Sequence, residues 1–154
     1  METQKEEVEI MAKSTYFTIA PEGFYRVLPI GRIDYLNLAE AREKRWEKVK
    51  AAIALPILAG EYKGKRLPLY QTLGLDTGGN PYLGENTKLG DILTKLGQRW
   101  GDGSKINLKM LEREMIAEVQ NSTRQGSTLR KVVELYLPAE FKAMYPEQFE
   151  AMNE

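Results

Sequence analysis

The alternation of apolar and polar positions is clearest in residues 46–59, where it predicts a β-strand. The odd positions are apolar and would face the core, while Trp46, Lys48 and Lys50 at even positions would face outward. A helix competes for this segment because Ala51, Ala52 and Ala54 are good helix formers. We expect the strand, because the length and flanks of the segment favour it. The inward residues would be Val49, Ala51, Ile53 and Leu55.

Four further segments have strand character. The first covers residues 23–35 and is rich in aromatic and β-branched residues. Pro29 and Gly31 interrupt it, which a bulge or an edge position would accommodate. The others are expected at 67–75, 114–122 and 129–137. The fourth strand would place Met115, Ala117 and Val119 on one face, and the fifth Val133, Leu135 and Leu137 inward with Arg130 and Tyr136 outward.

Different patterns mark the connections. Leucine and isoleucine at helical spacing predict a helix over residues 87–100, ended by Gly101, and a helical turn is expected at 108–111. Residues 36–45 fit either a loop or a helical turn. Residues 60–67 form a basic turn with two glycines. Residues 76–86 are expected to be a loop whose segment 77–81 cannot sit in a regular element, and a hairpin turn is expected at 123–127.

The order of these elements predicts one domain of the mainly β class. Three strands, one helix and a two-stranded hairpin suit a five-stranded Greek-key barrel of the oligonucleotide/oligosaccharide-binding (OB) type, with the helix between strands three and four. The barrel would cover residues 15–138, with order resuming at 16–19. Residues 1–14 would be an acidic arm, mobile or a short helix, and residues 139–154 an acidic tail, helical or disordered.

Charge is unevenly distributed although the net charge of the 154 residues is zero. Four glutamates against one lysine give residues 1–10 a charge of −3, and residues 139–154 have the same balance. The intervening body, with twenty basic and fourteen acidic residues, is at +6. Acidic ends on a basic body fit an anionic partner, although solvated tails that keep the chain soluble would look the same.

Composition excludes several kinds of chemistry. The sequence has no cysteine and no histidine, so it has no disulfide, no thiolate nucleophile and none of the commonest general bases or zinc ligands. No motif indicates a cofactor or a metal, so we expect a binding protein and no enzyme, although carboxylates alone could hold a metal. No apolar run approaches a membrane span and residues 1–13 lack a signal-peptide core. These features favour the cytoplasm of a bacterial or phage-infected host.

Two short motifs resemble phage-encoded OB-fold proteins that bind single-stranded DNA in replication modules. They are Gly23-Phe24-Tyr25-Arg26-Val27 and Gly60-Glu61-Tyr62-Lys63-Gly64-Lys65-Arg66-Leu67, followed in the family's order by the leucine-rich segment 89–96, by 115–119 and by Gly126. The resemblance covers roughly residues 15–138. It implies single-stranded DNA as partner, together with replication or recombination proteins. The long Gly-rich acidic tail of that family is missing, so a partner bound through the tail is less expected.

A single-strand binder needs cations for phosphates and aromatic faces for bases, so we expect nucleic-acid contacts from several segments. Trp46 is the least core-like aromatic residue, whereas core or turn packing is favoured over base stacking for Tyr62. The function predicted is non-specific single-stranded DNA binding in phage or mobile-element replication or recombination, with oligomers compatible. The alternative is a protein-interaction module, an inhibitor or accessory subunit. The candidate residues are Arg26, Arg32, Trp46, Lys48, Lys50, Tyr62, Lys63, Lys65, Arg66, Arg124, Arg130 and Tyr136.

Overall fold

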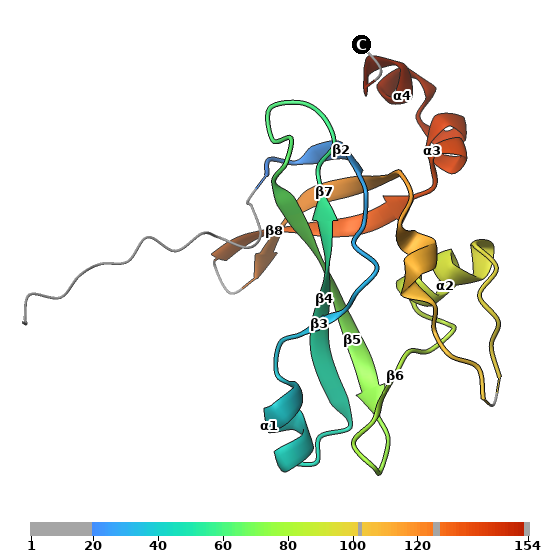
Figure 1. Cartoon of the computed structure of the whole chain (residues 1–154). Helices are drawn as coiled ribbons and strands as arrows, with labels where there is room; N and C mark the ends of the chain where they lie inside the picture. Colours follow the sequence, from blue (N-terminus) through green and yellow to red (C-terminus); the bar gives the residue numbers. More distant parts are fainter. Residues whose placement is uncertain (1–19, 102, 125–126, 153–154) are drawn as a thin grey trace, which may run out of the picture.

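The computed structural model describes residues 20–101, 103–124 and 127–152, and only the backbone within 122–130. The described residues form a mainly β structure with two antiparallel sheets, one curled into a half-barrel, and a few helices (Figure 1). The expected fold class is thus confirmed at this level. None of the helices in these ranges has both the length and the apolar character that crossing a bilayer requires. The expected arm at 1–14 and the order expected at 16–19 lie outside the described residues.

One sheet has the strand order β2-β7-β8 and the other β3-β4-β5-β6. The strands are β2 (Gly23–Val27), β3 (Asp34–Tyr35), β4 (Lys48–Pro56), β5 (Arg66–Leu75), β6 (Pro81–Tyr82), β7 (Met115–Arg124) and β8 (Ser127–Tyr136). The helices are α1 (Leu38–Glu43), α2 (Lys88–Lys95), the 3-10 helix η1 (Leu108–Leu111), α3 (Pro138–Met144) and α4 (Pro146–Met152).

Strand β4 confirms the strand predicted at 46–59 and its alternation. Its odd positions join the main core, and its start presents Lys48 and Lys50 to solvent. The competing helix is wrong because β4 pairs with β5 along its whole length, from Lys48 opposite Gly74 to Pro56 opposite Arg66. Cross-strand packing outweighs the helix propensity of alanine here. The core residues of β4 are Val49, Ala51, Ile53 and Leu55.

The expected first strand is broken in its middle. Residues 28–33, between β2 and β3, lie in no strand, and Pro29 is buried there. Proline has no N–H group to donate, so regular pairing stops. The N–H groups of Leu28 and Ile30 still donate to the carbonyls of Pro56 and Ala54, at 3.0 and 2.9 Å. The segment therefore crosses from the β7 side to β4.

Several connections differ from the expectation. Residues 77–81 were expected outside any regular element, but Pro81 pairs with Leu75 at the start of β6. A first-position proline at a sheet edge costs no ladder bond. The helix expected at 87–100 ends at Lys95, because Gly97 has a φ of +106° that ends the helix five residues early. Residues 38–43 are helical, which was one of the two alternatives for segment 36–45. Residues 108–111 form the predicted helical turn.

The β7–β8 hairpin contains a bulge that changes one inward residue. Val119 pairs with Val132 and Glu118 with Glu134, so Val133 has no partner on β7. Val132, and not the predicted Val133, therefore packs against the main core, while Leu135 and Leu137 face inward as predicted. Of the expected hairpin turn, residues 125–126 lie outside the described part of the chain.

A second apolar cluster lies on the other side of the β2–β7–β8 sheet. Phe24, Ile116 and Tyr136 pack there against Phe141 of α3, whose side chain is fully buried. The rings of Phe24 and Phe141 meet edge to face, with centroids 4.8 Å apart. We call this side of the sheet the covered face, because α3 and its neighbour α4 shield it. The residue 139–154 segment is thus helical where it is described.

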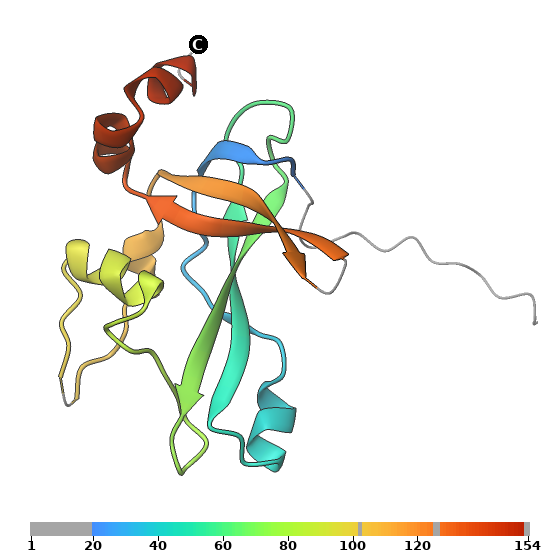
Figure 2. The same cartoon turned by 180° about the vertical axis from the view of Figure 1, so that it is seen from behind.

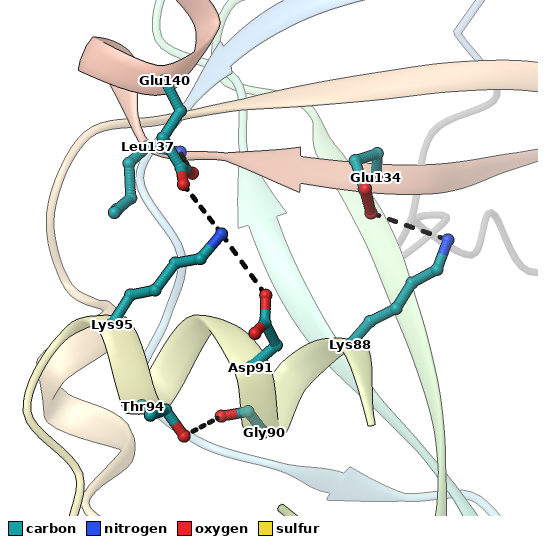
Figure 3. A network of polar contacts seen from close by, with 8 residues as sticks. All are labelled: Lys88, Gly90, Asp91, Thr94, Lys95, Glu134, Leu137 and Glu140. Atoms are coloured by element: carbon teal, nitrogen blue, oxygen red, sulfur yellow. Dashed lines mark hydrogen bonds and ion pairs between the residues drawn. The ribbon is translucent and has the colours of Figure 1, made fainter. Parts of the chain in front are cut away.

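Charged side chains hold α3 against α2 (Figure 3). Lys95 Nζ lies 2.7 Å from Glu140 Oε2 and 3.3 Å from Asp91 Oδ2. The hydrogen bond to Glu140, together with that to Asp91, raises the pKa of Lys95 above its ordinary value. At the start of α2, Lys88 Nζ donates to the Val133 carbonyl at 2.5 Å. These two lysines already have partners within the protein.

Candidate nucleic-acid interface

Strand register decides which side chains share the exposed side of the second sheet. Lys48 lies opposite Gly74 and Gly74 opposite Tyr82, while Lys50 lies opposite Thr72. Directly opposed residues of antiparallel strands point to the same side, so these side chains face away from the main core. We call this side the outer face. Its members are Asp34, Lys48, Lys50, Ala52, Tyr70, Thr72, Gly74 and Tyr82.

The end of α1 fixes the position of Trp46 beside this face. The Trp46 N–H donates to the Ala41 carbonyl at 2.9 Å and the Arg45 N–H to the Arg42 carbonyl at 3.3 Å. These two bonds form a Schellman motif, whose penultimate residue adopts the left-handed conformation that favours glycine. Arg45 occupies that position with a φ of +55°. The indole is 41% exposed, as expected for an outward aromatic residue, and Lys44 Nζ lies 5.5 Å from its centroid.

Trp46 and three cations line a shallow groove of about 570 Å³, which we call the outer groove. The cations are Arg45, Lys48 and Lys50, and Glu47 is the one acidic residue in its lining. Within the described part of the chain, these three cationic side chains have no ion-pair or hydrogen-bond partner. The structure therefore brings together the predicted residues Trp46, Lys48 and Lys50, with a net positive charge around an exposed indole.

Two exposed tyrosines on the outer face were missed by the sequence analysis. Tyr70 is 55% exposed and Tyr82 is 57% exposed. The Tyr82 ring lies over Gly74, where a Cβ would come within 2.2 Å of the ring. Tyr70 could have been found, because Leu67, Leu69, Leu73 and Leu75 alternate as the core side of its strand. Tyr82 gave no such signal, because its place depends on a two-residue strand.

The predicted turn residues gather at the other end of the β4–β5 ribbon. Segment 57–65 lies at the end opposite α1 and β6 (Figures 1 and 2). At about 3.3 Å per residue, β4 separates the two ends by roughly 25 Å. Lys63 and Lys65 are exposed there, while Arg66 is half-buried on β5. Tyr62 packs edge-on against Tyr25 with centroids 6.2 Å apart, so it has the packing role that the sequence favours for it.

The predicted arginines of the first strand are already paired. Arg26 contacts Glu114 through Nε at 2.6 Å and Nη2 at 3.0 Å, and this hydrogen bonding raises the pKa of Arg26. Arg32 Nε lies 3.2 Å from Asp34 Oδ1. Both arginines therefore have an internal carboxylate partner, and neither lines the outer groove.

Tyr136 does not have the solvent exposure predicted for it. It points away from the main core, as the alternation indicates, but it lies in the covered face and is 9% exposed. Its hydroxyl donates to Glu118 Oε1 at 2.8 Å, and burial with this bond raises the pKa of Tyr136. A helix that covers an outward strand face is invisible to alternation within the strand. The side chains of Arg124 and Arg130 lie outside what the structure describes.

The described residues contain no group of three or more acidic, cysteine or histidine side chains placed to hold a metal ion. The arrangement around Trp46 instead offers a flat aromatic surface, exposed cations and hydroxyl groups, which together suit reversible binding of an anionic, ring-containing ligand. Neither a search against protein-family models nor a search of curated proteins gave a match for this chain. The functional argument therefore depends on the geometry and charge of the site itself.

Proposed function

We propose that this protein binds single-stranded DNA without strong sequence preference, through the outer face and the outer groove. The observation that supports it best is the exposed Trp46 beside three cations that have no partner among the described residues. Each base stacked on an aromatic ring contributes about 1–3 kcal/mol, and lysines near the phosphates add binding through counterion release. Tyr70 and Tyr82 extend the aromatic surface along the sheet.

We propose further that the two sheets together form an OB-like barrel. Three hydrogen bonds support it by linking the first strand region to β4 and its continuation: Leu28 N–H to Pro56, Ile30 N–H to Ala54, and Leu58 N–H to Arg26. Contacts between β5 and β8 bring the other edges of the two sheets together. The resulting order around the barrel is β2-β4-β5-β8-β7, with α2 between the third and fourth long strands, as in OB-folds.

The role that follows is to cover and protect single strands during phage or mobile-element replication or recombination. That context comes from the motif resemblance at 23–27 and 60–67. We propose binding alone, with no chemical reaction on the DNA. A protein-docking module is the alternative, favoured by the zero net charge of the chain and by Leu36, which is 53% exposed near the groove.

Anisotropy titrations with labelled oligo-dT and with a duplex of equal length, at two salt concentrations, test the proposal. We expect oligo-dT to bind more tightly than the duplex, because stacking on Trp46 needs unpaired bases. Affinity should fall as salt rises, with a log–log slope of about −0.7 for each phosphate neutralised. Equal affinity for both DNAs would overturn stacking, and no binding at low salt would favour the protein-docking module.

A further inference from the structure

A second hollow lies beside the outer groove, between the end of α1 and the β5–β6 connection. Its volume is about 540 Å³, and we call it the α1 pocket. Arg42, Arg45, Trp46 and Glu47 line one side, and Leu75 with segment 76–79 lines the other. Arg45, Trp46 and Glu47 also line the outer groove, so they stand at the boundary between the two hollows. A volume of this size is in the range of small-ligand sites.

The two hollows differ in charge. The outer groove has three cations against Glu47, whereas the α1 pocket has two arginines against Glu47 and Asp76. A positive groove suits phosphates, while a balanced pocket suits a neutral ligand that both donates and accepts hydrogen bonds. The nucleobase of a single strand is such a ligand, and its phosphate would lie in the neighbouring outer groove.

Two polar groups of the α1 pocket, those of Asp76 and Arg42, are held in place by hydrogen bonds. Asp76 Oδ1 accepts from the N–H groups of Gly78 and Asn80, at 2.9 and 2.8 Å, which orders the loop and leaves Oδ2 available. Arg42 Nε donates to the Gly79 carbonyl at 2.9 Å, which ties α1 to the same loop. Within the described residues, the Glu47 carboxylate has no hydrogen-bond or ion-pair partner. The pocket therefore offers two carboxylates beside an aromatic ring, one held by its loop at Asp76 and one at Glu47 without a partner among the described residues.

We propose that the α1 pocket takes up one base of a single strand in the outer groove, and prefers bases with an exocyclic amino group. The inference rests on the proposed function and adds a base preference to it. The base would stack on Trp46 while its amino group donates to Glu47 or Asp76. Cytosine, adenine and guanine have such an amino group and thymine has none, and a carboxylate accepting from cytosine N4 is a known pairing.

The test compares oligo-dC with oligo-dT of the same length, by anisotropy at one salt concentration. The protein is used unchanged and as the double variant Glu47→Met, Asp76→Asn, in which methionine keeps the side-chain length but removes the acceptor oxygens of position 47. Asparagine keeps the oxygen that orders the loop, so circular dichroism should confirm an unchanged fold. Glu43→Gln is the matched control, because Glu43 lies on α1 and lines neither hollow.

The unchanged protein should bind oligo-dC about fivefold more tightly than oligo-dT, at the low end of the discrimination given by one good base contact. The double variant should bring this ratio close to one, while its affinity for oligo-dT rises because two negative charges are lost. The control should keep the ratio. A ratio of one in the unchanged protein, or an unchanged ratio in the double variant, overturns the base pocket and leaves the proposed function standing. Failure of both oligomers to bind at low salt overturns both proposals.

Discussion

The covered face and the outer face follow the same strand alternation, but the first is buried and the second is exposed to solvent. On the covered face, Phe24, Ile116 and Tyr136 point away from the main core and are then packed under α3, with Phe141 fully buried among them. On the outer face, Tyr70 and Tyr82 also point away from the core and remain more than half exposed. Alternation within a strand therefore determines which side chains point away from the main core. Whether those side chains are exposed depends on which other elements pack against that side of the sheet.

Charge separates the two faces in the same way. Arg26 on the covered face is neutralised by Glu114, and Glu118 accepts from Tyr136. The cations of the outer groove, Arg45, Lys48 and Lys50, have no such partner among the described residues. A net charge of zero over the chain thus conceals a local excess of positive charge. The covered face therefore contributes to stability, whereas the proposed binding depends on the outer face.

The largest effect is expected from Phe141→Ala on the covered face. Removing a fully buried ring from an aromatic cluster should lower the free energy of unfolding by about 3–5 kcal/mol. Urea denaturation measures this loss, and titration of the folded variant should give an unchanged affinity for oligo-dT. A loss below about 1 kcal/mol would mean that α3 is not a structural cover.

Trp46→Ala should have the complementary effect on the other face. We expect binding to oligo-dT to weaken by about 1–3 kcal/mol with the salt slope almost unchanged, because stacking releases no counterions. The free energy of unfolding should change little, since the indole is substantially exposed. If the free energy of unfolding fell by several kcal/mol and the affinity for oligo-dT stayed constant, Trp46 would have a structural role and no role in binding.

Arg45→Gly should improve stability and weaken binding at the same time. Glycine adopts the left-handed conformation of Arg45 without strain, so the free energy of unfolding should rise by up to about 1 kcal/mol. Loss of the guanidinium should weaken binding to oligo-dT. Arg45→Lys is the control that keeps the charge and the strained backbone. A glycine variant that binds as well as the original protein would remove Arg45 from the interface.

The smallest effect is expected from single lysines. Lys48→Gln or Lys50→Gln should each reduce the magnitude of the salt slope for oligo-dT by about 0.7. Lys95→Gln is the matched control, because Lys95 is paired with Glu140 and Asp91 and should leave the slope unchanged. A change of slope in the control but not at Lys48 would reverse the assignment of the two faces.

Much of the strand pattern could be predicted, because period-two alternation depends on neighbours within one strand. It correctly placed Val49 inward and Lys48 and Lys50 outward. It was wrong about the exposure of Tyr136, because the cover comes from α3, which lies in a different part of the chain. It also missed the shift at Val133, since a bulge depends on pairing across the hairpin.

The candidate site was predictable only in part, for similar reasons. Trp46 stood out beside charged neighbours, but its place depends on the Schellman motif that ends α1, and a sequence with arginine in place of glycine gives little sign of that motif. The grouping of Tyr82 with Lys48 depends on register across three strands. Conversely, sequence could not separate Lys48 from Lys63, which lie at opposite ends of the β4–β5 ribbon.

The most direct test of the outer face is the tryptophan emission of a Trp100→Phe variant, in which Trp46 is the single remaining tryptophan. The reciprocal variant Trp46→Phe, whose one tryptophan is Trp100, is the control. Trp100 is half-buried and its Nε1 donates to Thr94 Oγ1 at 2.8 Å. We predict that oligo-dT quenches the emission of Trp46 with saturation and leaves that of Trp100 unchanged. Saturable binding of oligo-dT with no change in the emission of Trp46 would contradict the assignment of the binding face.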